Sequence, residues 1–148
     1  MIMLTISSAL PCDVADLAAR ITEFDALELK AAGITVEGAT ANVQPLALRL
    51  AGELVCLFGA VPHPAAAGAA IPWMLCTRTL ERVPRRAMAA VSARVVADWC
   101  GRFTYLTNIV HRRNRRAIRF VQWLGFTVGD VPCGPGQEFY AFEWRRNV

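Results

Sequence analysis

Short apolar runs and amphipathic segments follow one another through the first third of the chain. Residues 3–7 are an apolar run that predicts a strand. Apolar positions then recur at intervals of three and four after Pro11 and again after Thr22, which fit a helix start and a helix cap, and Gly33 fits a helix end. We therefore expect a strand and two helices, followed by a polar connection with a short strand at residues 34–37.

The middle third is more apolar and predicts strands before a long helix. Residues 46–50 and 54–61 flank a glycine-containing turn and predict a hairpin. Residues 70–77 are continuously apolar, as expected of a strand that is buried on both faces. A basic loop then leads to a helix with Pro84 in its first turn and Gly101 at its end. One face of this helix is apolar: Met88, Val91, Val95 and Trp99.

The last third centres on one amphipathic helix. Residues 103–110 predict a strand, and the helix begins at Asn114. Its apolar positions recur at helical spacing: Ala117, Ile118, Phe120, Val121 and Leu124. Gly125 fits a left-handed stop, after which residues 126–131 and 138–144 predict two strands joined by a turn rich in proline and glycine. Helices and strands alternate, which predicts an α/β fold.

The composition supports one folded domain, residues 1–148. Hydrophobic residues make up 55% of the chain and charged residues 19%, which is enough for a core and excludes a largely disordered protein. Arg49, Glu53 and His63 interrupt the apolar middle of the chain, so no membrane span is expected. The N-terminus lacks the basic leader and long apolar run of a signal peptide.

The cysteines give no sign of a metal site or a disulfide framework. There are five, they are scattered, and no Cys-x-x-Cys occurs. The two histidines, His63 and His111, lie far from any pair of cysteines. We therefore expect no bound metal and a reducing, cytoplasmic environment.

Arginine supplies the net charge of +4, because Lys30 is the only lysine. The arginines gather in residues 78–94 and 112–119, and two local clusters are better explained by an anionic ligand or partner than by a uniformly basic surface. Four of them stand at the start of a predicted helix, where the helix dipole is already positive: Arg112, Arg113, Arg115 and Arg116. Nucleic acid is not the partner we expect, since the tryptophans are dispersed and aromatic residues do not interleave with the arginines.

The segment from Asn114 to Phe126 reads N-x-x-A-I-x-F-x-x-x-L-G-F. It resembles the last motif of the GNAT (Gcn5-related) N-acetyltransferases, in which an asparagine opens the helix beside the pantetheine arm of acetyl-coenzyme A and Gly-Phe begins the next strand. The predicted order of elements is that of a GNAT domain over essentially the whole chain. The resemblance implies a single α/β domain with a mixed, mostly antiparallel sheet, splayed at its central strands and covered by helices on both faces.

The resemblance also implies a coenzyme A site after the continuously apolar strand. The family usually has Q/R-x-x-G-x-G/A there, because glycine lets backbone N–H groups approach the phosphates. Residues 77–86 contain no glycine, and arginine side chains replace those contacts in our interpretation. The alternative is a basic helix start in a fold that has lost its cofactor. The expected cofactor-binding residues are Leu75, Cys76, Thr77, Arg78, Arg82, Val83, Pro84, Arg85, Arg86, Asn114 and Ala117.

The position of the family's catalytic acid is altered. Many members have a tyrosine seven residues after the motif asparagine, which is Val121 in this chain. Tyr105 and Tyr140 are the alternatives, either as proton donors or as packed aromatic residues, and water is another donor. Asn108, an unusual polar residue late in a strand, either contacts the pantetheine or acceptor or caps the strand edge. Tyr105 and Asn108 are the catalytic candidates.

No carboxylate or histidine lies within residues 71–76, where a general base is expected. Glu53, His63 and His111 are candidates elsewhere, against the alternative that they are exposed turn residues. Cys76 would place a thiol near the thioester, although buried cysteine commonly acts as a small apolar residue.

Two stretches carry a narrower resemblance, Asn108–Phe126 and Phe139–Phe142. They are similar to small GNAT-like phage proteins described as internal virion or morphogenesis proteins, which implies a phage or prophage origin and a location in the host cytoplasm or the virion. Two main hypotheses follow, beside a weaker third in which the arginines bind phage or host nucleic acid. The first is N-acetyl transfer from acetyl-coenzyme A to an unknown amine. The second is a non-catalytic assembly protein with a phage or host protein partner, and a homodimer is left open.

Overall fold

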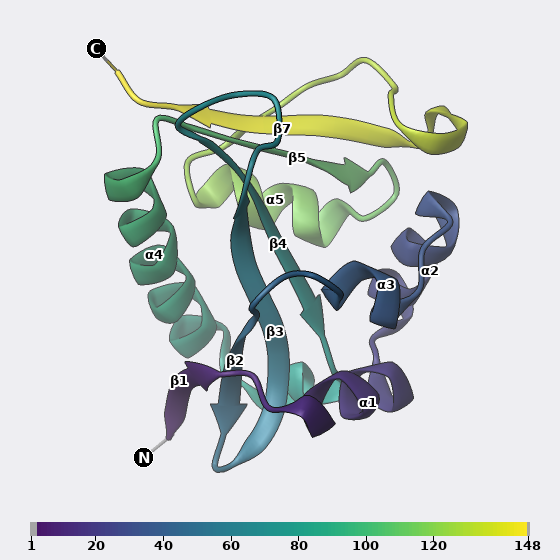
Figure 1. Ribbon diagram of the computed structural model, residues 1–148, viewed down its shortest axis with the longest axis vertical. Helices are drawn as coiled ribbons and strands as arrows, with labels where there is room; N and C mark the ends of the chain where they lie inside the picture. Colours follow the sequence, from purple (N-terminus) through teal and green to yellow (C-terminus); the bar gives the residue numbers. More distant parts are fainter. Residues whose placement is uncertain (1–2, 148) are drawn as a thin grey trace. The chain divides into compact units, whose positions relative to one another are not determined.

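The computed structural model describes residues 3–147, and Figure 1 shows its helices and strands along the chain. Within these residues the strands are hydrogen-bonded in the order β1-β2-β3-β4-β5-β7-β6. The pairs β1–β2, β2–β3, β5–β7 and β6–β7 are antiparallel, and β4–β5 is parallel. The strands are β1 (Leu4–Ser8), β2 (Leu46–Leu50), β3 (Glu53–Pro62), β4 (Ala69–Cys76), β5 (Tyr105–His111), β6 (Thr127–Val128) and β7 (Phe139–Arg145). This mixed, mostly antiparallel sheet confirms the predicted fold class.

The chain divides into two compact units, each made of separate segments. The first unit contains the residues up to Gly59 together with Trp73–Pro84, and the second contains Ala60–Pro72 together with the chain from Arg85 onward. Strands β3 and β4 each pass from one unit to the other. The single domain inferred from composition stays a prediction, and each unit is described by itself.

The core of the first unit forms where α1 (Pro11–Arg20) and α2 (Glu23–Ala32) pack with β2, β3 and β4. Leu54–Phe58 of β3 are buried at five consecutive positions, so both faces of this strand are covered. The most buried apolar side chains of this core are Leu17, Leu29, Val36, Ala47, Leu54, Leu57 and Leu75. Burial of this apolar surface drives the packing of the unit.

The starts and ends of the N-terminal helices follow from their capping residues. The Thr22 side chain accepts a hydrogen bond from the Asp25 backbone N–H, and Gly33 ends α2 at φ 74°. The strand predicted at residues 34–37 is wrong, because Thr35 caps a short helix, α3 (Val36–Thr40), by accepting from the Gly38 backbone N–H at 3.0 Å. A side-chain cap thus outweighs the short apolar run.

Strand β4 was expected to be buried on both faces, and this is only partly correct. Its ends are buried, but Met74 is 37% exposed and Ile71 and Trp73 are half-buried. In the second unit its parallel ladder with β5 consists of two residue pairs, Ala69 with Tyr105 and Ala70 with Leu106. Pro72 lacks a backbone N–H and cannot continue a regular ladder, which accounts for the end of this ladder at Ala70.

The second unit is built on β5 and β7, which pair along their full lengths. The prediction placed Pro84 in the first turn of a helix that ends at Gly101, but α4 (Arg85–Arg102) begins one residue after Pro84 and runs through Gly101, so the predicted stop there is wrong. It buries Met88, Val96 and Trp99. The strand expected at residues 126–131 is reduced to β6, because the chain leaves the ladder after Val128. The turn before β7 contains the short 3-10 helix η2 (Pro135–Gln137).

Candidate functional site

The segment after β4 in the first unit is a 3-10 helix, η1 (Arg78–Arg82), and not the irregular loop expected. Thr77, fully buried, holds it to β3: its backbone N–H donates to the Val55 carbonyl at 2.8 Å, and its hydroxyl donates to the Leu54 carbonyl at 2.6 Å. The same hydroxyl accepts from the Thr79 backbone N–H at 3.3 Å. The arginines of η1 therefore stand on a fixed backbone.

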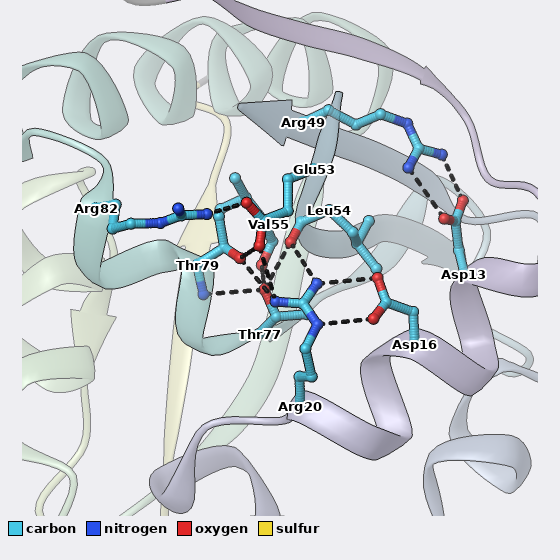
Figure 2. A network of polar contacts seen from close by, with 10 residues as sticks. All are labelled: Asp13, Asp16, Arg20, Arg49, Glu53, Leu54, Val55, Thr77, Thr79 and Arg82. Carbon is cyan, nitrogen blue, oxygen red and sulfur yellow. Dashed lines mark hydrogen bonds and ion pairs between the residues drawn. The ribbon is translucent and has the colours of Figure 1, made fainter. Parts of the chain in front are cut away.

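Glu53 holds the outer end of η1. Figure 2 shows its carboxylate bound by the Arg82 guanidinium and by the Thr79 hydroxyl, the latter at 3.0 Å. These hydrogen bonds, with Arg82 the larger cause, lower the pKa of Glu53. A carboxylate with a lowered pKa is a poorer proton acceptor, so the geometry disfavours Glu53 as a general base. Glu53 is instead the counter-ion of Arg82, which the sequence predicts to bind phosphate.

Arg20 of α1 joins this network, and the sequence had not singled it out. Its guanidinium donates to both carboxylate oxygens of Asp16, at 2.7 and 2.9 Å, and to the Thr79 hydroxyl at 2.8 Å (Figure 2). The hydrogen bonds from Arg20 lower the pKa of Asp16. The four-residue spacing of Asp16 and Arg20 in a predicted helix was a signal for their pairing. The hydrogen bond from Arg20 to Thr79 of η1 could not be predicted from the sequence, because the two residues are brought together only by the fold.

The end of β4 is bound by the start of α2. The backbone N–H of Cys76 donates to the Asp25 carboxylate at 2.7 Å, and the Cys76 carbonyl accepts from the Thr22 backbone N–H at 2.9 Å. Burial raises the pKa of Asp25 to about 6, although hydrogen bonds from Cys76 and Thr22 oppose the shift. A carboxyl group of this kind is suited to accept a proton near neutral pH. From the sequence, Asp25 is recognisable only as an acidic residue three positions after the capping Thr22.

The remaining predicted residues of this segment differ in exposure. Leu75 and Val83 are buried, and Arg78, Pro84, Arg85 and Arg86 are exposed. The Cys76 thiol is buried, and its pKa is raised by a hydrogen bond with the Cys56 thiol and by burial. Such a thiol is inert, so Cys76 fits the apolar interpretation.

In the second unit, Asn108 lies where the β4–β5 ladder ends. Its side-chain N–H donates to the Pro72 carbonyl at 2.6 Å, and its side-chain oxygen accepts from the Ile109 backbone N–H at 2.7 Å. Tyr105, on the same strand, donates its hydroxyl to Glu143 at 2.7 Å, and the Arg145 guanidinium lies 4.2 Å from its ring centroid. Both side chains are bound within the unit, and their catalytic roles stay predictions.

The turn into α5 (Arg115–Trp123) is organised by Asn114, which is buried and accepts from the Ala117 backbone N–H at 3.2 Å. The structure thus shows the capping role, and a cofactor contact of Asn114 or Ala117 stays a prediction. His111 is not an exposed turn residue: it is buried, packs edge-on to Phe139, and accepts at Nδ1 from the Arg113 backbone N–H at 3.2 Å.

The other acid and base candidates have structural roles as well. His63 accepts from the Ala65 backbone N–H at 3.1 Å, and the ring of Tyr140 lies under the Arg112 guanidinium. Val121, where the resemblance implied an acid, is half-buried on α5. Among residues 3–147 no three His, Cys, Asp or Glu side chains gather as a metal site, and no helix is long and apolar enough to cross a membrane.

The residues of the first unit fit a phosphate-bearing ligand through charge rather than through backbone N–H groups. In η1 the backbone N–H groups of Thr79, Leu80 and Val83 already have acceptors within the segment. The exposed guanidinium groups on either side, of Arg78 and Arg82, are well suited to phosphate. Arg82 must leave Glu53, at least in part, to bind such a ligand.

Fold and site together define an α/β protein with a mixed, mostly antiparallel sheet and an arginine-bearing turn after β4. Solved structures share this architecture. A GCN5-related N-acetyltransferase from Kribbella flavida aligns with a TM-score of 0.69 and 19% identity over 97% of this chain and 98% of that one. The ribosomal-protein-S18-alanine N-acetyltransferase from Escherichia coli aligns with a TM-score of 0.62 and 16% identity, over 97% and 94%.

A spermidine/spermine N-acetyltransferase from Vibrio cholerae aligns with a TM-score of 0.64 and 12% identity, over 96% of this chain and 92% of that one. No protein-family model matches the sequence, and no curated protein matches it. The chain therefore has the GNAT fold, as the Asn114–Phe126 motif predicted. The similarity in sequence is too low to transfer an activity.

Proposed function

We propose that the protein is an N-acetyltransferase that binds acetyl-coenzyme A and transfers the acetyl group to an amine. The observation that carries the proposal is the arginine-bearing η1 at the end of β4, on a strand whose ladder with β5 stops after Ala70. A strand edge followed by a cationic turn offers hydrogen bonds to an extended amide-containing arm and charge to its phosphates.

Two groups of residues would hold the cofactor, whose thioester supplies the activated acetyl group. Arg78 and Arg82, with Arg85 and Arg86 further along the chain, would bind the phosphates. On β4, the Thr77 backbone N–H is used by β3 and that of Cys76 by Asp25. Because backbone groups alternate along a strand, Met74 presents its N–H and carbonyl to the same edge as Cys76. We therefore extend the predicted Leu75–Thr77 contact to Met74.

Asp25 is the general base in this proposal. Its carboxyl group lies at the end of β4, and a pKa of about 6 leaves it mostly ionised at neutral pH yet basic enough to accept a proton from an attacking ammonium group. Among the carboxylates of this network, Glu53 and Asp16 have lowered pKa values and are less suited.

The test is acetyl-coenzyme A-dependent release of coenzyme A thiol in the presence of amines. Spermidine and a peptide with an N-terminal alanine are the first acceptors to try, because structural neighbours are named for acting on them. We expect release with at least one primary amine and its loss in Asp25→Ala. Thiol release in Asp25→Ala equal to that of the unaltered protein would remove Asp25 from the mechanism, and failure to bind acetyl-coenzyme A would overturn the proposal.

A non-catalytic assembly protein on the same fold is the second candidate. It is favoured by the chain's own use of the groups a cofactor needs: Glu53 binds Arg82, and Asp25 binds the Cys76 N–H. Val121, which cannot donate a proton, at the position where a catalytic acid is expected also favours this candidate. Under this proposal the protein is of phage origin, with a phage or host protein partner. Absence of acetyl-coenzyme A binding, together with a partner recovered from virions, would favour it.

A further inference from the structure

The outward face of α5 in the second unit carries positive charge and one large aromatic ring. The helix is amphipathic, with Ala117, Ile118, Val121 and Leu124 half-buried on the side that packs against β6. The opposite side is exposed and consists of Arg115, Arg116, Arg119, Gln122 and Trp123. No acidic residue occurs in Arg115–Trp123. The exposed side is therefore cationic along its whole length.

Trp123 lies on this arginine face. It follows Arg119 by four residues and Arg116 by seven, and both intervals return to one side of a helix. Its side chain is 61% exposed, and the Phe120 ring stacks on it with a centroid distance of 6.4 Å and an interplanar angle of 11°. Although aromatic residues are dispersed along the sequence, Trp123 lies beside Arg116 and Arg119 on one side of this helix.

The arginines of this face are not neutralised by the part of the chain that the structure describes. In residues 3–147 no ion pair involves Arg115, Arg116 or Arg119. By contrast, Arg20, Arg49 and Arg82 are each paired with a carboxylate. Adjacent unpaired guanidinium groups repel one another, and the positive end of the helix dipole adds to this, so an external anion would stabilise the face.

We propose that this face of α5 binds single-stranded nucleic acid, with the arginines on the phosphates and a base stacked on Trp123. An exposed planar ring beside guanidinium groups is the combination that single-strand binding uses, since every base has a stacking face and every nucleotide a phosphate. A membrane surface fits less well: a helix that lies on lipid presents its apolar face outward, and α5 turns its aliphatic side toward β6. This inference is independent of acetyl transfer.

The test is fluorescence anisotropy of a labelled oligothymidylate of about twelve nucleotides, from about 50 mM to about 200 mM salt. We expect binding that weakens steeply with salt. Arg119→Ala should reduce the slope of log K against log salt by about 0.7, the value for one lost phosphate contact on a single strand. Arg94→Ala is the matched control, because Arg94 is also an exposed helical arginine without an ion pair in residues 3–147, and it should leave the slope unchanged.

Trp123→Ala separates stacking from charge. It should weaken binding about tenfold with the salt slope unchanged, and Trp123→Phe should restore most of the loss. Three results would overturn the inference: no binding at about 100 μM protein in low salt, equal effects of Arg119→Ala and Arg94→Ala, or full binding by Trp123→Ala. Binding to phosphatidylserine vesicles without binding to the oligonucleotide would assign the face to lipid instead.

Discussion

Under the proposed function, the pairing of Glu53 with Arg82 would weaken anion binding at η1. An anionic ligand would compete with the Glu53 carboxylate for this guanidinium, and both side chains are exposed, so the ion pair is a weak one. Glu53→Gln removes the competing charge while retaining an acceptor for the Thr79 hydroxyl. We expect the affinity for coenzyme A, measured by calorimetry, to rise by up to about fivefold.

Glu81→Gln is the control for this change. Glu81 is an exposed carboxylate in η1 itself, and it is Glu53, not Glu81, that is ion-paired with Arg82. A general effect of charge would raise the affinity equally in both variants. The account requires a larger rise for Glu53→Gln than for Glu81→Gln.

Asp25 makes the protein less stable as the pH rises through its titration range. The folded-state pKa of about 6 exceeds the usual value of 3.8, so the folded state keeps a proton that the unfolded state releases between these two values. The stability from this group is full below about pH 4 and is lost by about pH 6, a difference of about 3 kcal/mol. Asp25→Asn should therefore stabilise the protein at pH 7 and have little effect at pH 4 in urea unfolding.

Asp16 makes the stability change with pH in the direction opposite to Asp25. Its pKa is lowered by Arg20, so its contribution is present above about pH 4 and is lost as the pH falls through the folded-state value. Asp16→Asn should destabilise the protein at pH 7 and lose its effect in acid. If both variants changed stability in the same direction at pH 7, the opposite environments assigned to Asp25 and Asp16 would be wrong.

At the scale of elements, the ion pair between α1 and β2 fixes the helix on the sheet. Arg49 donates to both carboxylate oxygens of Asp13, at 3.0 and 2.6 Å (Figure 2). Asp13 also accepts from the Leu10 backbone N–H at 2.7 Å. Burial raises the pKa of Asp13, but the hydrogen bonds from Arg49 and Leu10 outweigh it and the net shift is downward. The buried carboxylate depends on its partner.

Arg49→Leu should cost about 3 kcal/mol in urea unfolding at pH 7, because it leaves the Asp13 charge buried without its counter-ion. The double variant Arg49→Leu with Asp13→Asn should recover much of this loss, since the amide keeps an acceptor for Leu10 but carries no charge. Equal stabilities of the single and double variants would show that the cost comes from lost packing of Arg49 and not from the unpaired charge.

Elements with their own capping residues could be predicted from the sequence, and those that depend on distant partners could not. Thr22, Gly33 and Asn114 carry local signals and fixed the helix limits correctly. Gly101 carries a helix-stop signal, yet α4 continues for one more residue, to Arg102. The shortening of β6 at Val128 depends on where β7 lies, which no local residue indicates.

At the scale of the whole molecule, the fold was predictable because the order of elements and the Asn114–Phe126 motif agreed. The site was predictable only in part. Arginine clusters indicate an anion, but the carboxylates that meet them, such as Glu53 on Arg82, come from other parts of the chain. The same holds for Asp25, whose role follows from its hydrogen bond to Cys76, far along the sequence.

We propose that the GNAT fold of this chain retains a coenzyme A site at η1. Its most direct test is a calorimetric titration with acetyl-coenzyme A of the unaltered protein, of Arg82→Ala with Arg85→Ala, and of Arg94→Ala with Arg119→Ala as a control of equal charge. We expect saturable binding that the first double variant loses and the control keeps. No binding at about 1 mM ligand, a level at which even weak complexes of about −4 kcal/mol form, or equal losses in both double variants, would contradict it.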